Sequence, residues 1–216
     1  MSFDPREWII RIAVLLFAIT IHEYAHGKAA LSLGDPTAKN AGRLTLNPIS
    51  HIDPLGAICL FLFHIGWAKP VPVNPAYFQN VKRDTVLMAL SGPITNISAA
   101  LVAGIFIRNF LLPWEVYLKI LVYMILMNTG LGLFNLFPIP PLDGSHVLEN
   151  LLPARASITY RHAGRYAPFI VIGILFMTNY LHINILGKLF TYPILYMAHL
   201  FGGDNLFRLL GLLREL

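Results

Sequence analysis

Three long apolar stretches decide what this chain of 216 residues can fold into. They cover about residues 8–33, 86–107 and 116–137, and each is long enough for a helix to cross a bilayer, which takes about 20 residues. Charged residues make up only 12% of the chain, against about 25% in a typical soluble domain. The sequence therefore predicts an all-α, multi-pass membrane protein with a core of three spans.

Two shorter or later apolar stretches follow this core. Residues 166–186 predict a fourth span, whereas residues 189–201 are short and predict either a fifth span or a helix lying partly in the interface. Residues 205–216 are amphipathic, with Arg208 and Arg214, and predict a surface helix. The expected architecture is a single membrane-embedded domain over residues 1–216, with one or two spans added to the core.

The segment between the first two spans, residues 34–85, is rich in proline, glycine and asparagine. Residues 42–46 alternate like a short strand, and residues 55–67 are apolar but too short to span. These features predict a short re-entrant, β-hairpin-like segment that serves as a lid or as an edge for an extended substrate. Residues 69–75 then resemble a polyproline-like return to the surface.

The basic residues predict the orientation of the chain, because cytoplasmic loops of membrane proteins carry an excess of lysine and arginine. If the spans alternate, one side receives Lys28, Lys39, Arg43, Lys69, Lys82, Arg83, Arg155, Arg161 and Arg165. The other side receives Arg6, Arg11, Arg108, Lys119 and Lys188. We therefore expect residues 34–85 in the cytoplasm and the N-terminus outside.

The first apolar stretch contains a polar cluster, His22-Glu23-Tyr24-Ala25-His26, which is costly in hydrocarbon and so indicates function. Residues four apart lie on one face of a helix, so His22 and His26 can bind one metal ion. Glu23 lies on the adjoining face, where it can accept a proton from metal-bound water. HExxH also occurs by chance in soluble helices, but its place in an apolar span favours zinc binding over chance occurrence. We expect one zinc ion per chain.

A catalytic zinc usually has three protein ligands, and Asp143 is the expected third. It follows the third apolar stretch, where three prolines within four positions interrupt the helix and let the carboxylate turn inward. Counting along the spans places His26 and Asp143 at a similar depth, about 10 Å below the cytoplasmic surface at about 1.5 Å per residue. Taken alone, Asp143 also suits a helix cap or a turn.

Two asparagines in the second and third apolar stretches, Asn96 and Asn135, have two interpretations each. A buried amide can hold helices together, or it can donate a hydrogen bond to a developing oxyanion and support the substrate. The sequence leaves both roles open for both residues. Gly92-Pro93 lies just before Asn96 and predicts a close approach of helices at that point.

Three motifs fall in order on the three core stretches: His22-Glu23-x-x-His26, Gly92-Pro93-x-x-Asn96 and Asn135-x-x-Pro138-x-Pro140-x-x-Asp143-Gly144. Together they resemble the site-2 protease family of intramembrane zinc metalloproteases, peptidase family M50. Gly66-Trp67-Ala68-Lys69-Pro70 is also similar to bacterial members. The resemblance implies zinc ligation by His22, His26 and Asp143, with Glu23 as catalytic base. It also implies cleavage of a transmembrane protein substrate after a prior cut by another protease.

The chain differs from some members of that family in its expected domain content. Residues 34–85 are too few for an inserted PDZ domain, and residues after 150 leave no room for a pair of CBS domains. We therefore expect a minimal, bacterial-type enzyme of the cell membrane, with its active site toward the cytoplasm. Its expected partners are a transmembrane substrate and membrane lipid, with no nucleic acid; the sequence leaves the oligomeric state open.

Two other classes of function use the same residues without hydrolysis. A membrane zinc carrier or sensor needs the ligands alone, but a carrier predicts further ligands leading to both membrane faces, and the spans show no such trail. A catalytically silent scaffold more naturally loses Glu23 or a ligand, and this chain has all four residues. A zinc-dependent endopeptidase that cuts in or near transmembrane segments is the leading hypothesis.

Overall fold

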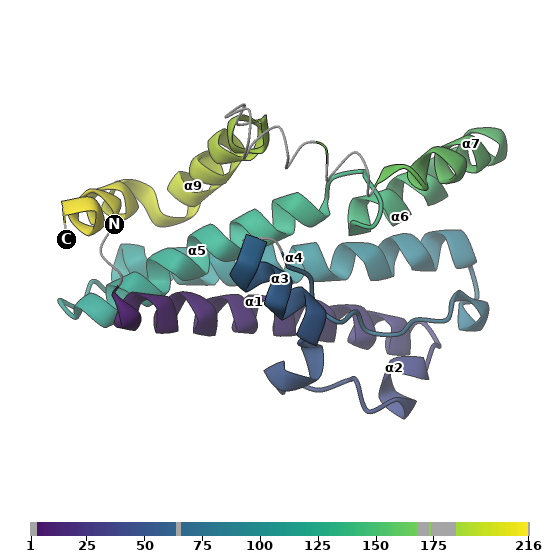
Figure 1. Ribbon diagram of the computed structural model, residues 1–216, viewed down its shortest axis with the longest axis horizontal. Coiled ribbons are helices and arrows are strands. Elements are labelled where there is room, and N and C mark those ends of the chain that lie inside the picture. The colour runs from purple at the N-terminus through teal and green to yellow at the C-terminus, as the bar shows by residue number, and fades with distance from the viewer. Residues whose placement is uncertain (1–3, 64–65, 168–172, 174–184, 216) are drawn as a thin grey trace.

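The computed structural model describes residues 4–63, 66–167, 173 and 185–215. Over these ranges the chain is helical and contains no strand. Three of the described helices are long and apolar enough to cross a membrane, namely α1 (Pro5–Ser32), α4 (Val81–Asn109) and α5 (Glu115–Asn135). Figure 1 shows the three running alongside one another down the long axis of the molecule. The predicted multi-pass, all-helical core is confirmed.

Side chains fix where the first two spans begin. The Asp4 carboxylate accepts a hydrogen bond from the Arg6 amide at 2.9 Å, which caps the first turn of α1. At α4, the Asn80 side chain accepts from the Arg83 amide at 3.1 Å, while the Asp84 carboxylate accepts from the Asn80 amide at 2.9 Å. This reciprocal pair satisfies two amides that a helix start leaves free.

Helix α4 is the centre of the packing, because it contacts α1, α5, α6 and α9 (Ile185–Glu215). The apolar core lies between α4, α5 and α9, and its buried residues are Ala103, Ile107, Leu121, Val122, Ile125, Ala198 and Leu206. This cluster occupies the C-terminal part of α4. The N-terminal part of α4 instead faces the polar residues of α1.

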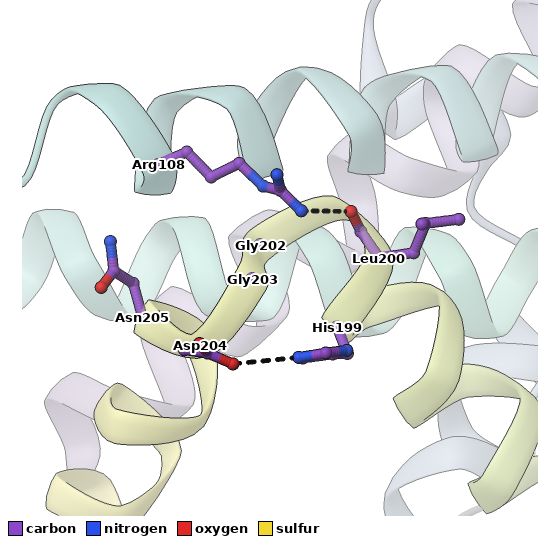
Figure 2. A pocket seen from close by; sticks show the side chains of 7 residues that line it. All are labelled: Arg108, His199, Leu200, Gly202, Gly203, Asp204 and Asn205. Atoms are coloured by element: carbon purple, nitrogen blue, oxygen red, sulfur yellow. Dashed lines mark hydrogen bonds and ion pairs between the residues drawn. The ribbon is translucent and has the colours of Figure 1, made fainter.

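Helix α9 breaks at Gly203, whose φ of 65° is open to glycine but disfavoured for other residues. Figure 2 shows Arg108 reaching from α4 to the residues before this break, where it donates to the Leu200 carbonyl at 2.6 Å. Arg108 also donates to the Phe201 carbonyl at 2.7 Å. Gly104 makes the approach fit, because a Cβ there would lie 2.6 Å from the Phe201 carbonyl carbon. The two halves of α9 are therefore fastened to α4 at their junction.

The break falls between two expected C-terminal elements. Residues 189–201 and 205–215 lie on either side of Gly203 within α9, and α9 is not among the described helices that are long and apolar enough to span. The predicted span at residues 166–186 falls almost wholly outside the described residues.

The predicted β-hairpin-like segment is wrong for the described part of residues 34–85. Before α4, the described residues of this segment instead form four short helices: α2 (Thr37–Asn40), η1 (Pro48–His51), α3 (Pro54–Phe63) and η2 (Pro75–Tyr77). An isolated antiparallel bridge joins Ile52 and Ala68 and does not extend into a ladder. The physical reason lies in the return segment, because Pro70, Pro72 and Pro75 have no amide hydrogen to give to a partner strand.

The third span ends as the sequence predicts, just before its prolines. Helix α5 ends at Asn135, and α6 (Asp143–Leu151) begins seven residues after the C-cap Leu136. Gly144 lets α6 fold back on this end, because a Cβ there would lie 2.2 Å from the Leu136 carbonyl oxygen. Helix α6 packs against α4, and α7 (Ala154–Gly164) follows it. The fold-back brings Asp143 to α1.

Candidate metal centre

Three side chains from two distant parts of the chain converge on one point. His22 and His26 lie one turn apart on α1, and Asp143 is the first residue of α6. The two Nε2 atoms are 3.0 Å apart, and Asp143 Oδ2 lies 3.1 Å from that of His22 and 3.3 Å from that of His26. Both imidazoles are buried. The predicted grouping of these three residues is what the structure shows.

The backbone of α4 fixes the ring of His26. Its Nδ1 lies 2.8 Å from the Met88 carbonyl oxygen, and because a carbonyl can only accept, Nδ1 must carry the proton. A neutral imidazole protonated at Nδ1 presents a lone pair at Nε2. His26 is therefore held with its metal-binding nitrogen toward the site, as is usual for a histidine that ligates a metal.

Two asparagines fix the ring of His22 in the same sense. The Asn96 amide nitrogen donates to the Ala18 carbonyl at 3.0 Å and to Asn128 Oδ1 at 2.9 Å. The amide oxygen of Asn96 is thereby turned to His22 and accepts from Nδ1 at 2.6 Å. Asn128 is itself held, because its own amide nitrogen donates to the Met124 carbonyl at 3.0 Å. Asn96 and Asn128 are both fully buried.

This arrangement fits a cation with tetrahedral coordination. With both Nδ1 protons donated outward, the site presents two imidazole lone pairs and a carboxylate oxygen, which repel one another unless a cation lies between them. Asp143 Oδ2 is buried and has no hydrogen-bond partner among the described residues. For zinc bonds of about 2.0–2.1 Å, two ligands of a tetrahedron lie about 3.3 Å apart. The observed separations of 3.0–3.3 Å match that edge.

Gly92 leaves the space in which the two imidazoles meet. A Cβ at this position of α4 would lie 2.4 Å from His26 Nε2 and 2.8 Å from His22 Nε2. Any residue other than glycine therefore displaces both candidate ligands. The close approach predicted at Gly92-Pro93 is confirmed, and it serves the site itself.

Glu23 and Asn135, the other predicted site residues, have different surroundings. Glu23 is half-buried on α1 between the two histidines, and its Oε2 accepts a hydrogen bond from the Val71 amide at 2.9 Å. Asn135 is half-buried at the end of α5, and its amide nitrogen donates to the Leu131 carbonyl one turn back at 3.0 Å. A role for Asn135 in substrate support stays a prediction.

Comparisons with known proteins agree with the geometry. The profile of peptidase family M50 matches residues 112–178. YwhC of Bacillus subtilis, which carries a zinc-metalloprotease name, is 37% identical over 176 residues, covering 77% of this chain and 80% of that protein. The chain belongs to peptidase family M50.

Other relatives are less similar in sequence. Rip2 of Mycolicibacterium smegmatis, also named as a zinc metalloprotease, is 27% identical over 180 residues, with 79% of this chain and 68% of that protein covered. Rip2 of Mycobacterium tuberculosis is 30% identical over 148 residues, or 66% of this chain and 57% of that protein. No solved structure matches the chain significantly. Membership makes this M50 protein a metalloendopeptidase with zinc as its cofactor.

Three contributors to this M50 site escape the sequence reasoning. Asn128 is a buried amide within an apolar span, and that placement alone is a usable signal. Gly92 is visible as part of a motif, but its service to the imidazoles needs the packing of α4 on α1. Val71 contributes a backbone amide, so its side-chain type indicates no role, and only the prolines on either side distinguish it in the sequence.

Proposed function

We propose that this M50 protein is an intramembrane endopeptidase that hydrolyses peptide bonds in or near transmembrane segments of its substrates. The observation that carries the proposal is the position of the ligands. His22 and His26 lie within α1 and are held by groups of α4, and both helices are long and apolar enough to cross a membrane. A substrate bond must therefore come to a site that lies beside spanning helices.

The residues supply the parts that peptide hydrolysis requires. His22, His26 and Asp143 hold zinc, which when bound polarises a carbonyl and makes water more acidic. Glu23 accepts a proton as general base and returns it to the leaving amine as general acid. Asn96 and Asn128 keep His22 in the tautomer that can bind the metal. The low dielectric of a site among apolar helices strengthens each of these interactions.

The substrate is expected to be a membrane protein shortened beforehand by another protease. A helical transmembrane segment hides its amide bonds in its own hydrogen bonds, so it must unwind before a bond reaches Glu23. A long domain on the substrate hinders such entry, and its removal eases it. The bulk of the basic residues on one side of the spans supports an active site toward the cytoplasm.

Proteolysis in liposomes tests the activity. The purified protein is reconstituted with model single-span substrates, each in a full-length form and a form lacking its outer domain, with Glu23→Gln as the inactive control. We expect cleavage within or next to the span, faster for the shortened form. Stoichiometric zinc with no cleavage across a broad panel of such substrates would refute the proposal.

Cysteine labelling tests the orientation. Cys59, the single cysteine of the chain, is replaced by serine, and an exposed residue at either end of the spans, Lys39 or Asn109, is changed to cysteine. A membrane-impermeant maleimide should label Asn109→Cys in intact cells and Lys39→Cys only in inverted vesicles. The opposite pattern would place the active site toward the outside.

A further inference from the structure

A short non-helical segment, residues 69–74, runs along α1 next to the metal centre (Figure 1), and we call it the strap. It joins the Gly66-Trp67-Ala68-Lys69-Pro70 motif to η2 and contains two prolines, Pro70 and Pro72. The strap contributes no zinc ligand, and the proposed hydrolysis assigns it no role. Its contacts with α1 suggest one.

The strap is fastened at both ends to the segment that follows α1. At its start, the Lys69 amide donates to the His51 carbonyl at 2.9 Å, and the Arg43 guanidinium donates to the Lys69 carbonyl at 2.7 Å. At its end, the Asn74 amide donates to Asp35 Oδ2 at 2.7 Å. Asp35 is fully buried just beyond α1. The strap is therefore anchored at both ends alongside α1.

Between these anchors, Val71 contacts α1 through its backbone and its side chain. Its amide donates to Glu23 Oε2 at 2.9 Å. Val71 is only 8% exposed, and its side chain lies against Gly27, one turn after Glu23, where a Cβ would come within 3.2 Å of Val71 Cγ1. The absence of a side chain at Gly27 thus lets Val71 pack close to α1, near enough for its amide to contact Glu23.

The sequence of the strap selects this one amide. Pro70 and Pro72 have no amide hydrogen, so Val71 carries the single backbone donor of the run Pro70-Val71-Pro72. Proline also restricts the backbone on either side, which limits the directions in which that donor can point. A hydrogen bond to an ionised carboxylate is about twice as strong as one between neutral groups.

We propose that Val71 is a positioning residue, whose backbone amide holds one carboxylate oxygen of Glu23 so that the other is presented for proton transfer. Glu23 has three side-chain torsions and is only half-buried, so α1 alone does not fix its carboxylate. The inference rests on the proposed base role of Glu23, and it gives the strap a function in the family reaction.

Hydrogen exchange tests the contact without any substrate. Because both neighbours of Val71 are prolines, overlapping peptides that differ by residues 70–72 report the exchange of the Val71 amide alone. We expect protection in the wild-type protein and in Glu23→Gln, whose side chain keeps an acceptor oxygen. In Glu23→Ala, exchange at Val71 should be at least about 10-fold faster. Equal exchange rates in the wild-type protein and in Glu23→Ala would overturn the proposal.

Kinetics test the consequence. Val71→Pro removes the donor, Val71→Ala keeps it and removes packing, and Val73→Pro adds a proline to the strap away from Glu23. We expect kcat to fall by about 10- to 100-fold in Val71→Pro, the cost of misplacing a catalytic group by about 1 Å, with KM and zinc content unchanged. Val73→Pro should keep kcat within about threefold of the wild-type value, and Val71→Ala, which keeps the donor, should lower kcat less than Val71→Pro does.

The outcomes separate the two proposals. Two outcomes would overturn the positioning role. One is an equal fall in kcat in Val71→Ala and Val71→Pro, which would show that packing matters and not the donor. The other is a rise in kcat in Val71→Pro, which would show that the strap inhibits the enzyme. If Val71→Pro loses zinc or does not fold, a variant with an ester bond in place of the Val71 amide replaces it in the test, because the ester removes the donor alone. Failure of the wild-type protein to cleave transmembrane substrates refutes the proposed function, whereas the exchange result still decides the contact.

Discussion

Gly92→Ala is the sharpest single test of the metal centre, because one methyl group enters the space where the ligands meet. Its Cβ would lie 2.4 Å from His26 Nε2, whereas ordinary contact begins at 3.4 Å, so the ring must move by about 1 Å. Zinc–ligand distances tolerate only about 0.2 Å. Loss of an outer-shell partner alone costs about 10- to 100-fold in metal affinity, so this displacement should cost at least about 100-fold, or about 2.8 kcal/mol.

The measurement is zinc affinity by competition with a chromophoric chelator in detergent, together with the melting temperature of the zinc-free protein. Gly130→Ala is the matched control, since it adds the same methyl inside α5, where the nearest atom lies 3.5 Å away on Ile194. Replacing glycine by alanine within a helix is itself stabilising by about 0.5–1 kcal/mol. We expect unchanged zinc affinity in the control. Wild-type zinc affinity in Gly92→Ala would show that α4 does not face the imidazoles as described.

Three further changes probe other parts of the structure. Asp143→Asn removes the ionised ligand and should weaken zinc binding by more than about 10-fold, so an unchanged affinity would remove Asp143 from the ligand set. Asn96→Ala releases Nδ1 of His22 and should weaken zinc binding by about 10- to 100-fold, measured in the same chelator assay. Gly104→Ala should separate α4 from α9 and lower the melting temperature, while zinc affinity stays the same; a loss of zinc there would contradict the separation of core and site.

The ligand set was predictable because its chemistry is costly in a membrane. Two imidazoles four residues apart in an apolar span indicate one metal site, and a carboxylate after a proline-broken span indicates the third ligand. The structure brings His22, His26 and Asp143 together as that reasoning expects. The apolar lengths likewise gave the three core spans to within a few residues.

Residues 34–85 show where such reasoning fails. Alternating and apolar stretches indicate strands, but a ladder needs amide donors in register on both sides, and the prolines of the strap remove them. The apolar run after Asp53 forms helix α3 instead, and the Asp53 carboxylate accepts from the Gly56 amide at 2.8 Å at its start. The contact of Val71 with Glu23 depends on how the strap packs against α1, which the sequence alone does not show.

The ligands come from opposite ends of the core in sequence, and this has a consequence for how the molecule holds together. A zinc ion bound by α1 and by the start of α6 acts as a staple that closes a loop containing both other spans. Closing so long a loop lowers the chain entropy of any loosened state, so the ion favours the assembled helices over separated ones. In this protein the catalytic cofactor thus also ties the first helix to the segment that must fold back after the third.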